Sequence, residues 1–272
     1  SNNSTVFNAV LQNLVDQKFP VNDDMKEDAA TIIKQIKSAY KSNYGDNYKD
    51  SLNQALTSAG YKNLSEYRQK MIKQIQYANF LLDYIDDHFD DVFNDYYQQC
   101  APKYVSLIKI SVSDTSSPTD DETSKLNEVK ELISNTDKSF GDIAQDYSND
   151  STSSKKGSLG IVDSKDTSGI ANSYGKDVFN AIEALSEGQV SDVITGDNGY
   201  YFVKVTSTDK KTLKKELKKT DIDSPLLAYD DYLQYVVYNS YKINYKDKDI
   251  KKIVQEVVNK ALEERKTERG EA

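Results

Sequence analysis

The chain has 272 residues, of which 37% are hydrophobic and 29% charged, and its formal net charge is −9. Its length fits one large or two smaller domains, and its 10% aromatic content argues against intrinsic disorder. The negative charge disfavours nucleic acid as a partner and weakens any electrostatic adhesion to an anionic membrane, because both require a basic face.

The first hundred residues are expected to be helical. In TVFNAVLQNLVDQKF (5–19), apolar side chains recur three and four residues apart and form one buried stripe, and Pro20 ends this helix. Four further helices are predicted: about 24–40, a short one from about Tyr48, a long one that Asn63 and Glu66 cap, and DDVFNDYYQQC (90–100). This part of the chain is therefore expected to be an all-helical segment.

After Pro102 the apolar period changes to that of a strand. KYVSLIKISV (103–112) alternates, with Leu107 and Lys109 on one face and Ile108 and Ile110 on the other. The elements predicted next are the helix DDETSKLNEVKELI behind a T-x-x-E capping box, the helix SFGDIAQDYS, a loop over NDSTSSKKGSLG, the helix DVFNAIEAL and the strand GYYFVKV (199–205). This order indicates a compact α+β domain.

The segment after Thr208 is predicted to be helical again. The lysine-rich KKTLKKELKKT (210–220) is expected to be a solvated linker or an exposed helix. Two helices should follow, LLAYDDYLQYVVYNSY and DKDIKKIVQEVVNKALEERK, the second with Val254 and Val258 on a buried stripe. Neither flank has a large core alone, so we expect the flanks to pack together. The predicted fold class is α+β, with a domain at 103–208 inserted into a helical domain made of 1–102 and 209–272.

The rare residue types exclude several classes of site. With Cys100 as its single cysteine, the chain cannot form an internal disulfide, and it has no Cys/His set for zinc, so neither a metal nor a cofactor is expected. His88, the only histidine, stands in DDHFDD, which argues against Ser/His/Asp and Cys/His hydrolases. No apolar run reaches the roughly 18 residues that span a bilayer. The chain opens with SNNSTVFNAV, so we expect that an export signal or lipid anchor has been removed.

Five segments of the middle domain together resemble the parvulin-type peptidyl-prolyl isomerases: SFGDIAQDYSND, KKGSLGIV, VFNAIEAL, SEGQVSDVI and GYYFVKV. The helical segments on either side are similar to those of the PrsA-type foldases, which are lipoproteins held outside the membrane of Gram-positive bacteria. The resemblance implies a parvulin-like fold, a groove that binds proline, and unfolded secreted polypeptides as partners. It implies membrane attachment only through a lipid anchor, and it leaves a homodimer open.

The resemblance also predicts the site residues, with two departures. Parvulins carry a histidine on each of two neighbouring strands, and these positions fall on Leu107 and Tyr201 here. Asp150 matches the family's acidic or Cys position, Phe179 matches the Phe of the proline pocket, and Leu159 lies in the matching KKGSLG segment. The family's Met position falls on Gly175, so no equivalent can be named. We assign Asp150 and Tyr201 to catalysis, and Leu107, Leu159 and Phe179 to substrate binding.

Each of these residues also has an ordinary structural role open to it. Asp150 stands in an Asn/Asp/Ser-rich stretch where a carboxylate commonly caps a turn, and Phe179 can be plain core. Gly157 and Gly160 most simply supply backbone freedom at a tight approach. A lone imidazole lacks its network partner, so the paired loss of both histidines suggests that a catalytic network has been dismantled as a unit.

Two functions remain open at this stage, with a third behind them. The leading hypothesis is an extracytoplasmic foldase or holdase, whose Tyr-lined cleft in the helical arms and vestigial proline groove bind unfolded secreted proteins. The alternative is an active prolyl cis-trans isomerase that uses Asp150, Tyr201 and Phe179. The third is a surface maturation factor dedicated to one exported enzyme.

Overall fold

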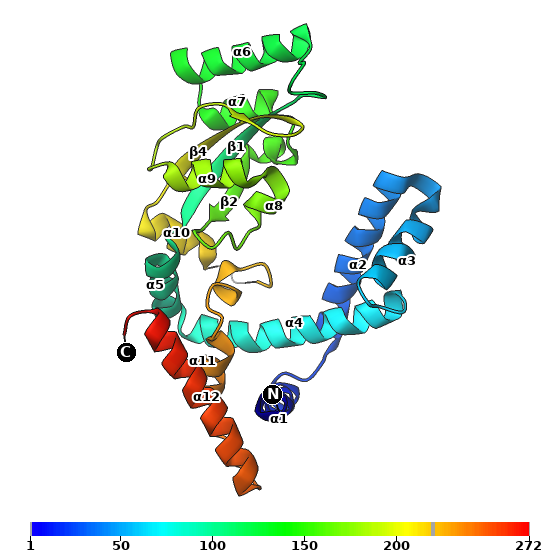
Figure 1. Ribbon diagram of the computed structural model, residues 1–272, viewed down its shortest axis with the longest axis vertical. Coiled ribbons are helices and arrows are strands. Elements are labelled where there is room, and N and C mark those ends of the chain that lie inside the picture. Colours follow the sequence, from blue (N-terminus) through cyan, green and yellow to red (C-terminus); the bar gives the residue numbers. More distant parts are fainter. Residues whose placement is uncertain (1, 219–220, 272) are drawn as a thin grey trace. The chain divides into compact units, whose positions relative to one another are not determined.

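The computed structural model describes residues 2–218 and 221–271 and divides into two compact units (Figure 1). One unit, here called the helical unit, combines residues 1–88 with 220–272, and the other, the sheet unit, comprises 89–219. Since the flanks join in one unit, the predicted architecture of an α+β domain inserted into a helical domain is confirmed. The limits 102/103 and 208/209 of the inserted domain stay a prediction.

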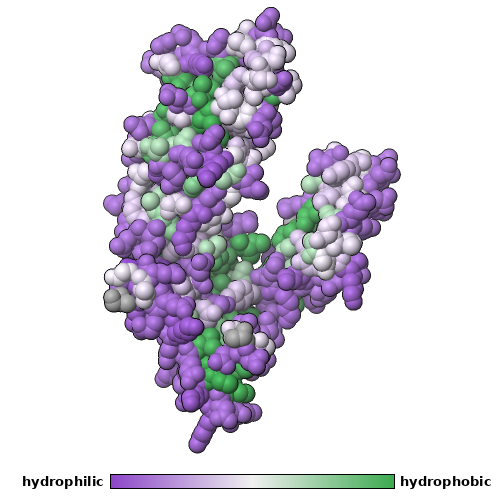
Figure 2. Space-filling model, in the orientation of Figure 1, coloured by the Kyte–Doolittle hydropathy of each residue, from purple (hydrophilic) through white to green (hydrophobic). Residues whose placement is uncertain are grey.

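The helical unit is built from both ends of the chain. Its elements are α1 (Asn2–Lys18), α2 (Asp23–Tyr44), η1 (Gly45–Asn47), α3 (Tyr48–Ser58), α4 (Leu64–Asp87), η3 (Pro225–Leu227), α11 (Leu233–Asn239) and α12 (Lys248–Glu268). Helix α1 packs against α12, while η3 and α11 pack against α4. In Figure 2, hydrophobic patches on this unit are bordered by hydrophilic residues, as expected of amphipathic helices that share a small core.

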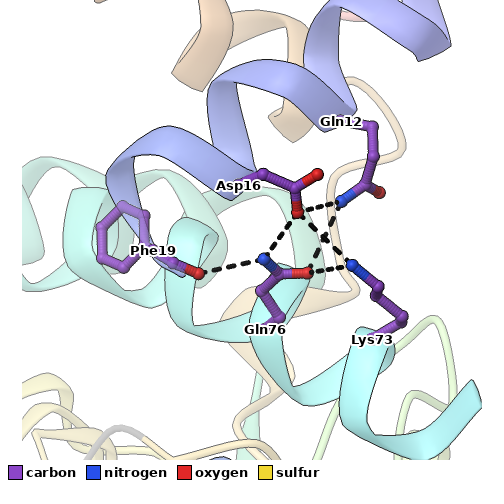
Figure 3. Close-up of polar contacts among 5 residues, drawn as sticks. All are labelled: Gln12, Asp16, Phe19, Lys73 and Gln76. Atoms are coloured by element: carbon purple, nitrogen blue, oxygen red, sulfur yellow. Dashed lines mark hydrogen bonds and ion pairs between the residues drawn. The ribbon is translucent and has the colours of Figure 1, made fainter. Parts of the chain in front are cut away.

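A polar network fixes the end of α1 on α4 (Figure 3). The amide of Gln76, which is only 1% exposed, donates to Asp16 Oδ1 at 2.9 Å and to the Phe19 carbonyl oxygen at 3.0 Å. Gln12 also donates to Asp16 Oδ1, at 2.9 Å. These amide donors, that of Gln76 first, lower the pKa of Asp16 from its ordinary value. A buried amide with both hydrogens bonded defines the register of α1 on α4.

One predicted helix of this unit is broken. The stretch 226–241 was expected to be a single helix, but η3 and α11 are separated at Ala228–Tyr232. At this break lies Asp230, whose side chain is 2% exposed; it accepts a hydrogen bond from Arg265 Nε of α12 at 2.9 Å and forms an ion pair at 3.3 Å with Arg269, the C-cap of α12. Asp230 also accepts from the Tyr232 N–H. We infer that the pairing of this carboxylate with two arginines interrupts the helix predicted over 226–241.

The sheet unit contains a four-stranded antiparallel sheet in the order β2-β1-β4-β3. Its strands are β1 (Lys103–Ser111), β2 (Ser158–Val162), β3 (Ile194–Thr195) and β4 (Gly199–Ser207); its helices are α5 (Phe89–Cys100), α6 (Asp120–Asn135), α7 (Phe140–Tyr147), η2 (Ser151–Lys155), α8 (Ile170–Tyr174), α9 (Lys176–Ala184) and α10 (Lys210–Leu217). Residues of α6 and α7 pack in the core on one face of the sheet, and residues of α8 and α9 pack in the core on the other.

The alternation in 103–112 correctly separates the two cores. Leu107 belongs to the core with α8 and α9, and Ile108 to the core with α6 and α7. The capping box at Thr119 and Glu122 is also confirmed. The loop prediction for NDSTSSKKGSLG is wrong, because its end forms β2, and α8 and β3 were missed.

The lysine-rich segment after Thr208 is a helix, α10, with Asp209 as its cap. It is not wholly solvated, because Leu213 is 0% and Leu217 is 7% exposed. These two leucines hold α10 to the sheet unit. Lys219 and Thr220, the last residues of the predicted segment, lie outside the described residues.

Candidate functional site

Leu107 and Tyr201 lie on the same face of two adjacent strands. In the β1–β4 ladder Leu107 pairs with Val203 and Lys109 pairs with Tyr201, so Leu107 and Tyr201 are diagonal neighbours. Both belong to the core cluster that contains α8 and α9, and Leu159 and Phe179 pack against this cluster as half-buried side chains. The structure therefore brings together four of the five predicted site residues.

Asp150, the fifth, reaches this cluster through a tyrosine. It is the N-cap of η2 and accepts from Thr152 N at 3.1 Å and Thr152 Oγ1 at 2.6 Å. The hydroxyl of Tyr174 also donates to Asp150, at 3.1 Å, and the ring of Tyr174 meets that of Tyr201 edge to face at 6.1 Å. Asp150 thus performs the turn-capping role that its sequence context favoured, and it orients Tyr174 as well.

The phenol of Tyr201 is held in place from several sides. Its hydroxyl donates to Asn198 Oδ1 at 3.0 Å, and its side chain is 3% exposed. The ammonium of Lys109 lies 5.8 Å from the ring centroid, within the range of a cation–π contact. Tyr201 is therefore a neutral ring that is packed on its neighbours and hydrogen-bonded through its hydroxyl.

A hollow of about 440 Å³ opens beside Tyr201. It lies between the α8–α9 corner and the β3–β4 turn, and its lining includes Tyr174, Val178, Ile194, Asn198 and Tyr201. Among the described residues that line this hollow, Tyr201 is the only one of the five predicted site residues. Leu107 is 0% exposed and lies in the core behind it. Tyr174 and Asn198 were missed. The available signal for Tyr174 was its position directly before Gly175, the residue that the resemblance matches to the family's Met.

Both phenols of the site stay protonated at neutral pH. Burial, followed by the charge of Asp150 and its hydrogen bond, raises the pKa of Tyr174 to about 12. Burial, followed by the charges of Asp150 and Asp197, raises the pKa of Tyr201 as well. The site therefore presents protonated phenol hydroxyls close to the carboxylates of Asp150 and Asp197.

This arrangement predicts an alkaline loss of stability. The unfolded chain releases the Tyr174 proton near pH 10 and the folded chain only near pH 12, so the contribution of Tyr174 is complete below pH 10 and is lost as the pH rises to about 12. Urea unfolding across this range, monitored together with tyrosinate absorbance, measures the effect. Tyr174→Phe should flatten the dependence, and an unchanged profile in this variant would contradict the assignment.

Neither a metal nor a membrane span is evident in the described part of the chain. Among residues 2–218 and 221–271, no group of three or more His, Cys, Asp or Glu side chains is arranged to hold a metal ion. Over the same residues, no helix has the length and apolar character needed to cross a bilayer. Cys100, at the end of α5, is buried and is not part of a disulfide.

Comparison with known proteins identifies the domain. The family model described as Rotamase, PPIC-type PPIASE domain, matches residues 107–207. Foldase protein PrsA of Staphylococcus epidermidis strain RP62A is 32% identical over 141 residues, or 49% of this chain and 41% of that protein, and PrsA of Staphylococcus aureus MRSA252 gives the same values. The chain thus spans about two fifths of the length of these relatives.

Two solved structures are similar over most of the chain. PrsA from Bacillus subtilis has a TM-score of 0.44 at 21% identity, with 93% of this chain and 89% of that one covered. PrsA from Streptococcus pneumoniae has a TM-score of 0.45 at 19% identity, with 94% and 90% covered. The chain therefore contains a PPIC-type rotamase domain over residues 107–207, and about half of the chain is similar to PrsA foldases.

Proposed function

We propose that this protein is an extracytoplasmic foldase that binds unfolded secreted polypeptides and whose parvulin-type proline site is degenerate. One observation supports the proposal: Leu107 and Tyr201, which the resemblance matches to the two parvulin histidines, are neighbours on one sheet face. Leu107 is buried and apolar, and Tyr201 is tied to Asn198 and packed on Tyr174. A domain that keeps this sheet face but lacks the two histidines could still bind a peptide by its shape.

The alternative, a working isomerase that uses Asp150, Tyr201 and Phe179, has one observation in its favour. The Tyr201 phenol lines the hollow, and its raised pKa preserves it as a hydrogen-bond donor. An isomerase needs no covalent step, since polar groups that stabilise the twisted amide are sufficient. Against this, Asp150 already accepts bonds from Thr152 and Tyr174, and Phe179 packs against the core.

The relation to PrsA-type foldases supports the rest of the proposal. It supports secreted polypeptides as partners and a location outside the cytoplasm, with attachment through a lipid anchor at the membrane–wall interface. A foldase that acts as a homodimer, or one dedicated to the maturation of a single exported enzyme, would be a more specific form of the same proposal. Neither nucleic acid nor a metal is needed for this work.

The test measures two activities of the same full chain. Isomerisation of a short Xaa-Pro peptide should keep its uncatalysed time constant, on the order of tens to hundreds of seconds, while aggregation of an unfolded client protein should slow. Tyr201→Phe, which removes only the hydroxyl, should leave both results unchanged. Clear acceleration of peptide isomerisation, abolished by Asp150→Ala and by Tyr201→Phe, would overturn the degenerate-site proposal. Failure to slow the aggregation of the client would overturn the foldase role.

A further inference from the structure

The helical unit carries a basic, tyrosine-rich surface in a chain whose net charge is −9. The connection between α11 and α12, with the first turns of α12, reads YKINYKDKDIKK (241–252) and contains five lysines and two aspartates, a local charge of +3. Within the described residues none of these five lysines makes an ion pair, and Asp247 is occupied as the cap of α12. The lysine–tyrosine surface is defined here as Tyr241, Lys242, Tyr245, Lys246 and Lys251, with the buried Tyr238 beneath it.

Two hollows flank this connection. One, of about 410 Å³, lies toward α12, and the other, of about 400 Å³, lies toward α1. Ile243 and Tyr245 line both hollows, so the hollows adjoin at the connection. Lys251 lines the first hollow, and Lys18, Lys242 and Lys246 line the second. The surface therefore offers concave space with cations on both sides.

The tyrosine rings of this surface are fixed before any partner arrives. Tyr241 stacks on Phe80 at 5.8 Å, with the ammonium of Lys18 6.0 Å from its centroid, and Tyr238 meets Phe7 edge to face at 5.3 Å. The hydroxyls of Tyr238 and Tyr245 are hydrogen-bonded to each other. Rings that are already immobilised lose little conformational entropy when they contact a ligand.

The uncharged polar residues that line the two hollows favour an acidic polypeptide over other anionic ligands. Carboxamides face both hollows, Gln255 and Asn259 on one side and Asn13 and Gln17 on the other. A carboxamide donates and accepts at once, which matches the peptide group, whereas a phosphate polymer or lipid headgroup needs donors alone. On the α4 side Asp83 and Asp87 neighbour Tyr241 and confine the cationic region to α1, the connection and α12.

We propose that the lysine–tyrosine surface binds extended polypeptide segments that combine acidic and aromatic residues. The inference rests on the proposed foldase role only in that clients supply such segments, and it gives the helical unit a selectivity separate from that of the proline site. Lysines would pair with client carboxylates and tyrosine rings would contact client side chains, while carboxamides would bond the client backbone. Because the surface charges are exposed, binding should weaken as salt rises.

Fluorescence anisotropy with the full chain tests this proposal. The probes are two labelled, proline-free peptides of equal length and aromatic content, one with Asp and Glu and one with Lys at the same positions. The acidic peptide should bind at least about tenfold more tightly, and Lys242→Glu/Lys246→Glu should remove that preference. Lys34→Glu/Lys41→Glu on α2 makes the same charge change elsewhere in the helical unit and should keep it.

Several outcomes would overturn the proposal. Equal affinity for the two peptides, equal losses in both double variants, or stronger binding to polyphosphate or to phosphatidylglycerol vesicles than to the acidic peptide would each do so. Client aggregation, measured in parallel, separates this inference from the proposed function. If the unmodified chain suppresses aggregation but shows no preference between the two peptides, the inference alone is wrong. If it prefers the acidic peptide but does not suppress aggregation, the foldase role alone is wrong.

Discussion

Asp230→Asn should lower the free energy of unfolding of the helical unit by about 3–5 kcal/mol, the usual cost of removing one partner from a buried ion pair. The Asp230 side chain is 2% exposed and accepts bonds from Arg265, 23% exposed, and Arg269, 10% exposed. Neutralising the carboxylate removes the charge that Asp230 supplies to two partly desolvated guanidinium groups. Urea unfolding monitored by far-ultraviolet circular dichroism measures the change.

The adjacent Asp231→Asn is the matched control. Asp231 is exposed, so its replacement should change the free energy by no more than about 0.5 kcal/mol. Because the chain has two compact units, the transition of the helical unit is to be followed separately, for example by amide hydrogen exchange in α12. A similar, small effect of both substitutions would show that Asp230 does not hold α12 in place.

Local patterns were sufficient to predict most elements of this fold. The three- and four-residue spacing of Phe7, Leu11 and Leu14 placed α1, and all three are buried. The alternation in 103–112 placed β1 and assigned Leu107 and Ile108 to opposite cores. In these segments the residues that signal the element also bury its inner face, so sequence and packing carry the same information.

The elements that the sequence did not predict depend on distant partners. Strand β2 (SLGIV) is short, contains a glycine and does not alternate, and it becomes a strand only through its pairing with β1. The break at Asp230 depends on Arg265 and Arg269, more than thirty residues away in the chain. No local signal distinguishes this aspartate from Asp231 beside it.

The candidate site divides in the same way. Family resemblance located Leu107 and Tyr201, and the strand register confirms that they are neighbours on one face. The resemblance did not give the link from Asp150 to Tyr174 and on to Tyr201, because Tyr174 ends α8, a helix that was not predicted from the sequence. Loops whose length departs from a family pattern can be placed only by their contacts.

Gly157→Ala should disrupt the sheet beneath this site, with a loss of about 3 kcal/mol or more in the stability of the sheet unit. A Cβ at Gly157 would lie 2.4 Å from the Leu107 carbonyl oxygen and 2.9 Å from Ala144 Cβ, and the Gly157 φ angle is +77°. The backbone cannot retreat without cost, because the Gly157 carbonyl accepts the Leu107 N–H at 2.8 Å. A left-handed residue alone costs roughly 1–2 kcal/mol, and displacement of the strand adds to it.

Gly160→Ala separates the two contributions. Gly160 has a similar φ angle of +74°, but a Cβ there would meet no heavy atom within 4 Å. This control should therefore lose only the conformational part, about 1 kcal/mol. Amide hydrogen exchange of β1, the strand that carries Leu107, measures the loss of stability in both variants of the full chain. Equal protection of β1 in the two variants would refute the close approach of Gly157 to Leu107, and with it the packing that brings Leu107 beside Tyr201.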